Sequence, residues 1–218
     1  MDKVKLLEIL KQVRANKGDR KFTQSIDVAF NLKELDLNKE EGKLEEFIQL
    51  PHGRAKPAKI CAIVGAELIE QAKKFCDFAI ISDDFPKWED KRKVKKLARE
   101  YDFFLGQANM MPQIAKTFGR YFGPVGKMPN PKAGQIIPPK GNIESIVKIL
   151  RNTIKVAIKK APVIHCSIGS EKFTDEQLAE NLIAIFEKLK SKLPRAQHNI
   201  ANTYVKTTMG GSVKLENA

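Results

Sequence analysis

Polar and apolar residues alternate near both ends of the chain. Every second residue is apolar over 25–32, and the alternation returns over 154–158 and 163–168. Such a pattern predicts strands with one face buried and the other in solvent. Apolar residues at helical spacing over 6–13 and 178–189 predict two amphipathic helices. The two ends of the chain therefore predict half-buried strands packed against helices.

The middle of the chain follows a different pattern. Continuous apolar runs at "KICAIVG", "FAIIS" and "FFLG" alternate with helix-like segments at 67–75 and 86–101. Runs without alternation indicate strands of a parallel sheet that is covered on both faces. The next stretch, 111–141, is rich in glycine and proline and predicts a helix followed by an ordered loop. A further short helix is expected to begin at Asn142.

This change of pattern divides the chain into two domains and predicts the α/β class. We expect residues 1–57 and 154–218 to form one domain from both chain ends, and residues 58–153 to form a domain inserted into it. Two chain crossings would join the domains. A paired linker of this kind allows hinge motion, because few contacts need to cross it.

The net charge of the chain limits the classes of partner that it is expected to bind. Among 218 residues, 39 Lys and Arg oppose 26 Asp and Glu, which gives a formal net charge of +13. Such a surplus favours a polyanionic partner, with an acidic membrane surface as the weaker alternative. We expect no membrane association, because no amphipathic basic helix stands free of a globular pattern and no apolar run approaches the ~18 to 20 residues of a span. The N-terminus lacks the continuous apolar segment of a signal peptide, which predicts a cytoplasmic protein.

Side chains suited to catalysis or metal binding form no recognisable group. Three widely separated cysteines lie in apolar runs, which predicts reduced, buried thiols. The three histidines show neither metal-ligand spacing nor the grouping of a nucleophile and its base. The segment "FGPVGKMPNP" fails as a phosphate-binding loop, because Tyr121 replaces its first glycine and Met128 its Ser or Thr. We therefore expect no metal, no cofactor and no enzyme activity.

Two basic segments each allow two interpretations. The predicted helix 86–101 carries seven Lys and Arg, and over 111–170 ten Lys and Arg face one acidic residue. Each could be a solvated surface that aids solubility. Each could instead contact phosphates, because cationic groups in that number attract a nucleic-acid backbone.

Residues that suit RNA recognition stand at the start of the first predicted strand. Arg20 and Lys21 supply cations, Phe22 supplies a ring for stacking, and Gln24 and Ser25 supply short polar groups. The alternative is that the phenylalanine ring continues the apolar row of the strand.

Five motifs together resemble one family. "KFTQSIDV", "LPHG", "GPVGKMPNPKAG", "HCSIG" and "TTMGGSVKL" are similar, in order along the chain, to the universal ribosomal protein L-one family, in its archaeal form. The resemblance implies a split α+β domain I and an inserted Rossmann-like domain II. It also implies binding to large-subunit ribosomal RNA at the mobile side stalk, help in release of exit-site tRNA, and repression of translation through the protein's own mRNA. Off the ribosome we expect a monomer.

Two alternatives remain open beside this resemblance. The first is an RNA-binding translational repressor that acts off the ribosome. The second is a nucleotide-using enzyme with its site at the switch point of the parallel sheet.

The same resemblance carries an RNA-binding role to further residues. Beside the residues around Phe22, these are His165, Ser167, Gly169, Lys206, Thr208, Met209, Gly210 and Gly211. We expect the Thr208 hydroxyl to meet a 2′-hydroxyl or phosphate, and Met209 to cover a ribose or base face. Gly210 is expected to take a positive φ or to lie close to a ribose. Substitutions in this loop should then leave the melting temperature near that of the wild type.

Overall fold

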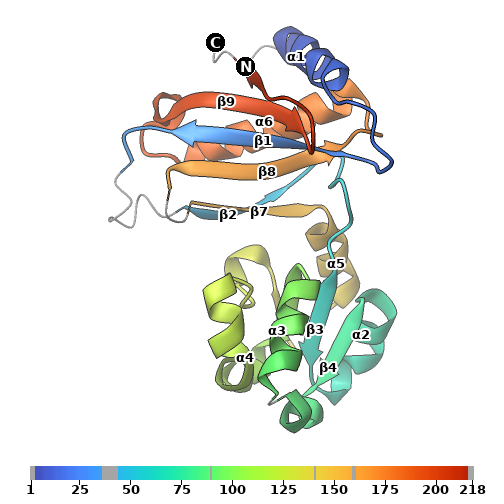
Figure 1. Cartoon of the computed structure of the whole chain (residues 1–218). Helices are drawn as coiled ribbons and strands as arrows, with labels where there is room; N and C mark the ends of the chain where they lie inside the picture. The colour runs from blue at the N-terminus through green and yellow to red at the C-terminus, as the bar shows by residue number, and fades with distance from the viewer. Residues whose placement is uncertain (1–2, 36–43, 89, 140, 159–160, 216–218) are drawn as a thin grey trace. The chain divides into compact units, whose positions relative to one another are not determined.

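The structure, a computed structural model, describes residues 3–35, 44–88, 90–139, 141–158 and 161–215. The chain divides into two compact units. Unit 1 comprises Met1–Pro57 and Asn152–Ala218, and unit 2 comprises Ala58–Arg151. Figure 1 shows that each unit contains its own sheet with helices packed against it.

Unit 1 is built around a four-stranded antiparallel sheet of order β10-β9-β1-β8. Its strands are β1 (Ser25–Leu32), β8 (Val163–Ser170), β9 (Ile200–Thr207) and β10 (Val213–Leu215). A second antiparallel pair joins β2 (Glu45–Gln49) to β7 (Thr153–Ala157). The helices are α1 (Lys3–Ala15) and α6 (Asp175–Lys192). In Figure 1, α6 lies behind the sheet, and no described helix covers the face turned toward the viewer.

The alternation along β1 determines which face of the sheet is buried. Its buried residues are Ile26, Val28, Phe30 and Leu32. They pack into one core with Leu6, Leu10 and Val13 of α1 and with the apolar side of α6. A capping box forms at the start of α6. There the Gln177 N–H donates to the Thr174 hydroxyl at 3.3 Å, and the Thr174 N–H donates to the Gln177 side chain at 3.2 Å.

The "LPHG" motif connects the segment after β2 to helix α6. The side chain of Asn181 is fully buried and donates to the carbonyl oxygens of Gly53 at 3.2 Å and Ile168 at 2.8 Å. It also accepts from the backbone N–H of His52 at 3.0 Å. Gly53 has φ +78°, a conformation that favours glycine. Through Asn181, the motif therefore links the backbone after β2 to α6 and to β8.

Unit 2 contains a parallel sheet of order β4-β3-β5-β6. Its strands are β3 (Ile60–Val64), β4 (Phe78–Ile81), β5 (Phe103–Gln107) and β6 (Ile136–Ile137). The helices are α2 (Ile69–Phe75), α3 (Lys91–Glu100), α4 (Met111–Val125) and α5 (Ile143–Arg151). Every residue of β3 and β5 is buried, which confirms the predicted covered sheet and the α/β class.

The helices of unit 2 cover the two faces of its sheet in pairs. The chain steps from β3 to β4 in one direction and from β4 across β3 to β5 in the other. Because such crossovers are right-handed, α2 and α3 lie on opposite faces. Helix α2 packs with α5, and α3 packs with α4.

Two features of unit 2 differ from the prediction. The helix expected over 86–101 is interrupted, because a 3-10 helix, η3 (Ser82–Trp88), precedes α3. The Asp90 carboxylate accepts from the Arg92 N–H at 2.9 Å, so it caps α3 and begins a new helix there. The short strand β6, inside the glycine- and proline-rich stretch, was not predicted, because two apolar residues are too few to show a strand period.

Candidate RNA-binding surface

The loop between β9 and β10, residues 208–212, is called the terminal loop below. It is hydrogen-bonded to the start of β1 through backbone groups. The Thr208 N–H donates to the Ser25 carbonyl at 3.0 Å, and the Met209 N–H donates to the Gln24 side chain at 3.0 Å. The Gly210 N–H donates to the Thr207 hydroxyl at 3.0 Å. The loop backbone is therefore fixed by the protein itself, which lowers the ordering cost of binding.

Gln24 forms the centre of this arrangement and is not available to RNA. Its side chain is 2 % exposed, and its amide nitrogen donates to the Lys17 carbonyl at 3.2 Å. Its amide oxygen receives the bond from Met209. Gln24 thus ties the end of α1 to β1 and the terminal loop, which corrects the expected direct contact. The strand alternation could have shown this, because Gln24 is in phase with Ile26.

The Thr208 hydroxyl is also engaged inside the protein. It accepts from the Ser25 N–H at 3.1 Å and lies 3.1 Å from the Ser25 hydroxyl. The internal bonds leave this half-buried hydroxyl less capacity for the predicted contact with a 2′-hydroxyl or phosphate, which stays a prediction. Its first role is to join the terminal loop to β1.

Thr208→Val is therefore expected to destabilise unit 1. The substitution keeps the shape of the side chain but leaves the half-buried Ser25 N–H without its acceptor. An unsatisfied group of this kind costs about 1 to 3 kcal/mol. Urea denaturation should show that loss, and Ser25→Ala, which keeps the backbone bond to Thr208, should lose less. Equal stability of Thr208→Val and wild type would contradict the assigned bond.

The two glycines of the terminal loop differ in what surrounds them. A Cβ added to Gly210 would lie 2.3 Å from the Thr207 hydroxyl and 2.7 Å from the Asn16 carbonyl oxygen, whereas nothing lies within 4 Å of one added to Gly211. Gly210 does not have a positive φ. The expected positive φ is therefore wrong, and glycine is required at 210 by the close approach to the segment after α1.

Gly169 lies inside unit 1 because of a β-bulge. Ile26 of β1 is opposite Gly169, whereas the next residue, Asp27, is opposite Ser167. The extra residue, Ile168, shifts the alternation, and both Ile168 and Gly169 are buried. A Cβ on Gly169 would lie within 2.8 Å of side-chain atoms of Phe173 and Leu178. Gly169 therefore makes room for the start of α6, which corrects its expected contact with RNA.

Two large apolar side chains remain exposed beside this framework. Phe22 is 51 % and Met209 is 56 % exposed. Arg20, Lys21 and Lys206 are exposed as well. Met209 is therefore not a core residue. An aromatic ring and a thioether next to cations can meet bases, riboses and phosphates together.

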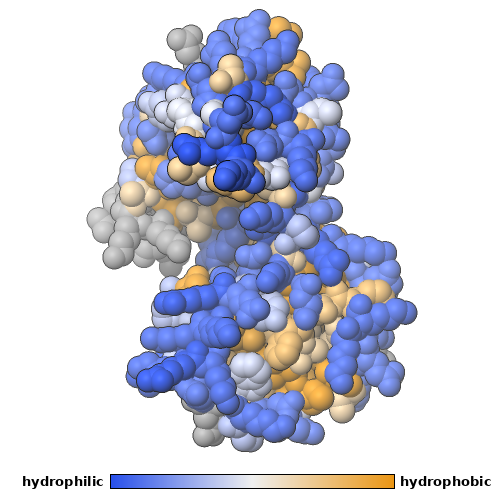
Figure 2. Space-filling view, turned by 45° about the vertical axis from the view of Figure 1, so that its right-hand side comes forward, coloured by the Kyte–Doolittle hydropathy of each residue, from blue (hydrophilic) through white to orange (hydrophobic). Residues whose placement is uncertain are grey.

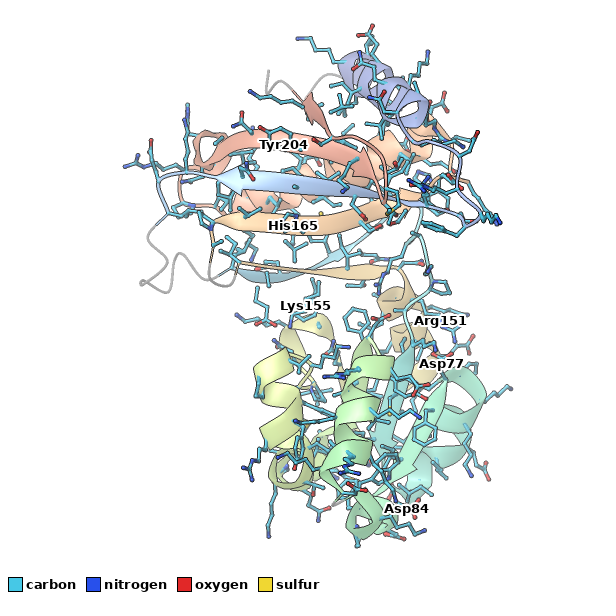
Figure 3. The ribbon with its side chains drawn as sticks, viewed as in Figure 1. Asp77, Asp84, Arg151, Lys155, His165 and Tyr204 are labelled. Atoms are coloured by element: carbon cyan, nitrogen blue, oxygen red, sulfur yellow. The ribbon has the colours of Figure 1, made fainter. Side chains whose placement is uncertain are left out.

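The open face of the sheet brings His165, Ser167 and Lys206 together. Asp27 of β1 is opposite Ser167 on one side and Lys206 on the other, and Ala29 is opposite His165 and Tyr204. Figure 3 places His165 on β8 and Tyr204 on β9, either side of β1. These residues line a hollow of about 510 Å³. Tyr204 and Asp27 are not among the predicted site residues, although Tyr204 is in phase with Lys206.

The cysteines and the glycine-rich motif of unit 2 have structural roles. All three thiols are free and buried, as predicted, and burial raises the pKa of Cys76 and of Cys166 to about 12. Such thiols stay protonated and are poor nucleophiles. In "GPVGK", Gly126 ends α4 with φ +69°, and the Lys127 ammonium donates to the Tyr101 carbonyl at 2.6 Å.

Two further observations concern metal ligands and membrane-spanning helices among the described residues. Within the described ranges, no three His, Cys, Asp or Glu side chains are grouped so that they could hold a metal ion. No helix in those ranges is long and apolar enough to cross a membrane. Figure 2 shows hydrophilic residues over much of the visible surface of both units.

A basic two-unit α/β protein with exposed stacking groups beside cations is typical of RNA-binding proteins. The model of the Ribosomal protein L1p/L10e family matches residues 10–211, and the chain belongs to this family. It is 41 % identical over 217 residues to the large ribosomal subunit protein uL1 of Pyrococcus horikoshii, covering 99 % of this chain and 97 % of that protein. The uL1 protein of Methanothermobacter thermautotrophicus is 41 % identical over 212 residues, covering 96 % and 98 %.

These matches confirm the family and the archaeal form suggested by the motifs. They identify a protein of the large ribosomal subunit that works with the ribosome in the cytoplasm. The relatives are named as ribosomal proteins and not as enzymes, so the nucleotide-using enzyme is no longer supported. Ribosomal RNA binding follows from the family as a class property.

Proposed function

We propose that the chain binds large-subunit ribosomal RNA at the mobile side stalk through unit 1. The observation that carries the proposal is the exposure of Phe22 and Met209 on backbone that Gln24 and Ser25 hold in place. Both side chains stand beside exposed cations, and an aromatic ring and a thioether in that setting can contact bases and riboses while the cations contact phosphates. We call the proposed contact region the unit 1 surface; it comprises Arg20, Lys21, Phe22, Ser25, His165, Ser167, Lys206, Thr208, Met209, Gly210 and Gly211.

Each part of the unit 1 surface supplies a different component of RNA recognition. Phe22 offers a ring on which a base can stack, and Met209 offers a polarisable apolar contact. Lys206 and the cations before Phe22 supply attraction to phosphates. The carbonyl and N–H groups of the terminal loop that remain outside the internal bonds can reach 2′-hydroxyl groups. A fixed loop favours one RNA shape over others, because it does not adapt to alternatives.

We further propose that the protein assists release of exit-site tRNA and represses translation by binding its own mRNA. If the unit 1 surface serves both RNAs, rRNA and mRNA exclude one another, and repression begins when free protein exceeds free rRNA. The alternative of a repressor that acts only off the ribosome predicts no co-sedimentation with large subunits. Crosslinking in cells, followed by sequencing of the attached RNA, distinguishes the two.

A shortened protein tests which unit carries rRNA recognition. It joins residues 1–57 directly to 152–218, so that it keeps the whole core of unit 1. We expect it to fold and to retain most of the affinity of the full chain for a side-stalk rRNA fragment, measured by filter binding. Affinity that instead followed an isolated 58–151 fragment would overturn the assignment to unit 1.

Salt dependence tests whether the positive charge contributes to this binding. Each phosphate neutralised by Lys or Arg releases counterions, so log K should fall linearly with log salt by roughly 0.7 to 0.9 per contact. We expect Lys206→Gln to reduce the magnitude of that slope by roughly 0.7 to 0.9, which is the contribution of one phosphate contact. The control, Lys11→Gln on α1, removes the same charge from an exposed residue outside the unit 1 surface and should leave the slope unchanged. A flat salt response of the wild type would contradict a role for phosphate contacts.

A further inference from the structure

Helix α3 of unit 2 has a strongly basic exposed face. Six of its ten residues are exposed cations: Lys91, Arg92, Lys93, Lys95, Lys96 and Arg99. None of the six forms an ion pair with a carboxylate in the part of the chain that the structure describes. The helix is docked through Val94, Leu97 and Ala98, which are buried in the core of unit 2. Its apolar side is therefore already used, which argues against insertion of this helix into a membrane surface.

This charge arrangement is locally unfavourable for a helix. Cations four residues apart, such as Lys91 and Lys95 or Arg92 and Lys96, repel one another across one turn. The first turn contains no acidic residue and three cations, which oppose the positive end of the helix dipole, and the single carboxylate of Asp90 at the N-cap offsets only part of that charge. A helix that served solubility alone would mix charges of both signs. Helix α6 does so, with Asp175 and Glu176 in its first turn and lysines in its last.

The neighbouring helix α4 continues the basic surface. Lys116 and Arg120 are exposed on α4, which packs against α3 on the same face of the sheet. They flank a hollow of about 510 Å³ between α4 and η3, lined also by Gln113, Thr117 and Tyr121. Acidic groups occur at one edge in η3, where Asp84 is paired with Lys87 at 2.6 Å. The hollow thus offers a ring, a hydroxyl and an amide beside two cations.

We propose that this α3–α4 face is a second RNA-binding surface, separate from the unit 1 surface. Cations one helical turn apart lie about 6 Å from one another, a spacing that suits successive phosphates of one strand. The hollow accepts an unpaired nucleotide, with stacking on Tyr121 and hydrogen bonds from Gln113 or Thr117. Single-stranded RNA is the occupant that this combination fits, because a duplex would present no free base to the hollow. The repulsion within α3 is offset when phosphates bind.

The proposal is tested in the full chain carrying Phe22→Ala and Met209→Ala, which weakens the unit 1 surface. The probe is a 12-nucleotide oligo(U), and the test variant adds Lys91→Gln with Lys95→Gln. The matched control adds Lys73→Gln with Lys74→Gln on α2, which removes two exposed charges from the opposite face of the sheet. Gln113→Ala, at the exposed rim of the hollow, tests the nucleotide site separately.

We expect the α3 pair to weaken oligo(U) binding by about tenfold at 100 mM salt and to reduce the salt slope by about 1.4, or 0.7 for each lost contact. The control pair should change binding less than twofold. The melting temperature should stay level or rise in the α3 pair, because a like-charge pair has been removed. Gln113→Ala should weaken oligo(U) binding but leave binding of a 16-base-pair RNA duplex unchanged.

Three results would overturn the proposal. The first is an equal loss of affinity in the α3 pair and the control pair, since net charge alone would then explain binding. The second is the absence of oligo(U) binding in the parent variant at low salt. The third is an α3 pair that binds oligo(U) normally but fails to bind vesicles containing phosphatidylserine, which would identify a membrane surface instead.

Discussion

Gly210→Ala is expected to weaken binding of the side-stalk rRNA fragment at least about tenfold and to lower the stability of unit 1. The added methyl group would lie 2.3 Å from the buried Thr207 hydroxyl and 2.7 Å from the backbone oxygen of Asn16. Backbone cannot move aside as a flexible side chain can, so the terminal loop must shift. Overpacking of this kind costs about 1 to 3 kcal/mol. A tenfold loss of affinity corresponds to about 1.4 kcal/mol.

The adjacent glycine provides a matched control for this prediction. Gly211 has open space around its Cα, and its φ is not positive. The free energy of unfolding of Gly211→Ala, measured in urea, should therefore lie within about 0.5 kcal/mol of the wild-type value. If Gly210→Ala were as stable as Gly211→Ala and bound RNA equally well, the close approach to the end of α1 would not exist in solution.

The alternation of β1 shows what a local pattern can predict. This alternation predicts both the strand and its buried face. Extended by two residues toward the N-terminus, it also places Gln24 in the buried row, although the motif resemblance predicts an RNA contact for Gln24. A polar residue at an inward position predicts an internal hydrogen-bond partner. That partner, the N–H of Met209, is 185 positions away in sequence. No local pattern could have named it.

The bulge at Ile168 shows where local patterns fail. Alternation counted along 163–168 places Gly169 on the open face, but one extra residue in β8 turns it inward. A bulge depends on the register against β1 and on the bulk of Phe173 and Leu178 beyond it. The pairing of β2 with β7 is equally non-local, since these strands stand on opposite sides of the insertion.

The predicted site residues fall into two groups with different physical roles. Gln24, Gly169 and Gly210 shape the backbone, and Thr208 joins two segments through its hydroxyl. Phe22, Met209 and the exposed cations have side chains that project into solvent. A motif resemblance cannot separate these groups, because both are needed for the same surface. Stability measurements can, since changes in the first group lower both stability and affinity, whereas changes in the second lower affinity alone.

Phe22→Ala combined with Met209→Ala is expected to reduce affinity for the side-stalk rRNA fragment by about 100-fold without changing the melting temperature. Loss of one stacked base costs about 1 to 3 kcal/mol, and loss of the thioether removes further dispersion contacts. Both side chains are more than half exposed in the free protein, so the core of unit 1 does not depend on them. Filter binding and thermal unfolding measure the two effects separately.

The control for this double substitution is Val4→Ala on α1, which removes an apolar side chain that is 70 % exposed but lies outside the unit 1 surface. It should leave both affinity and melting temperature unchanged. Of the two single variants, Phe22→Ala should lose more RNA affinity than Met209→Ala, because stacking on a ring buries more surface than contact with a flexible thioether. A strong drop in melting temperature for Met209→Ala, with unchanged affinity of the folded fraction, would show instead that Met209 packs into the protein in solution.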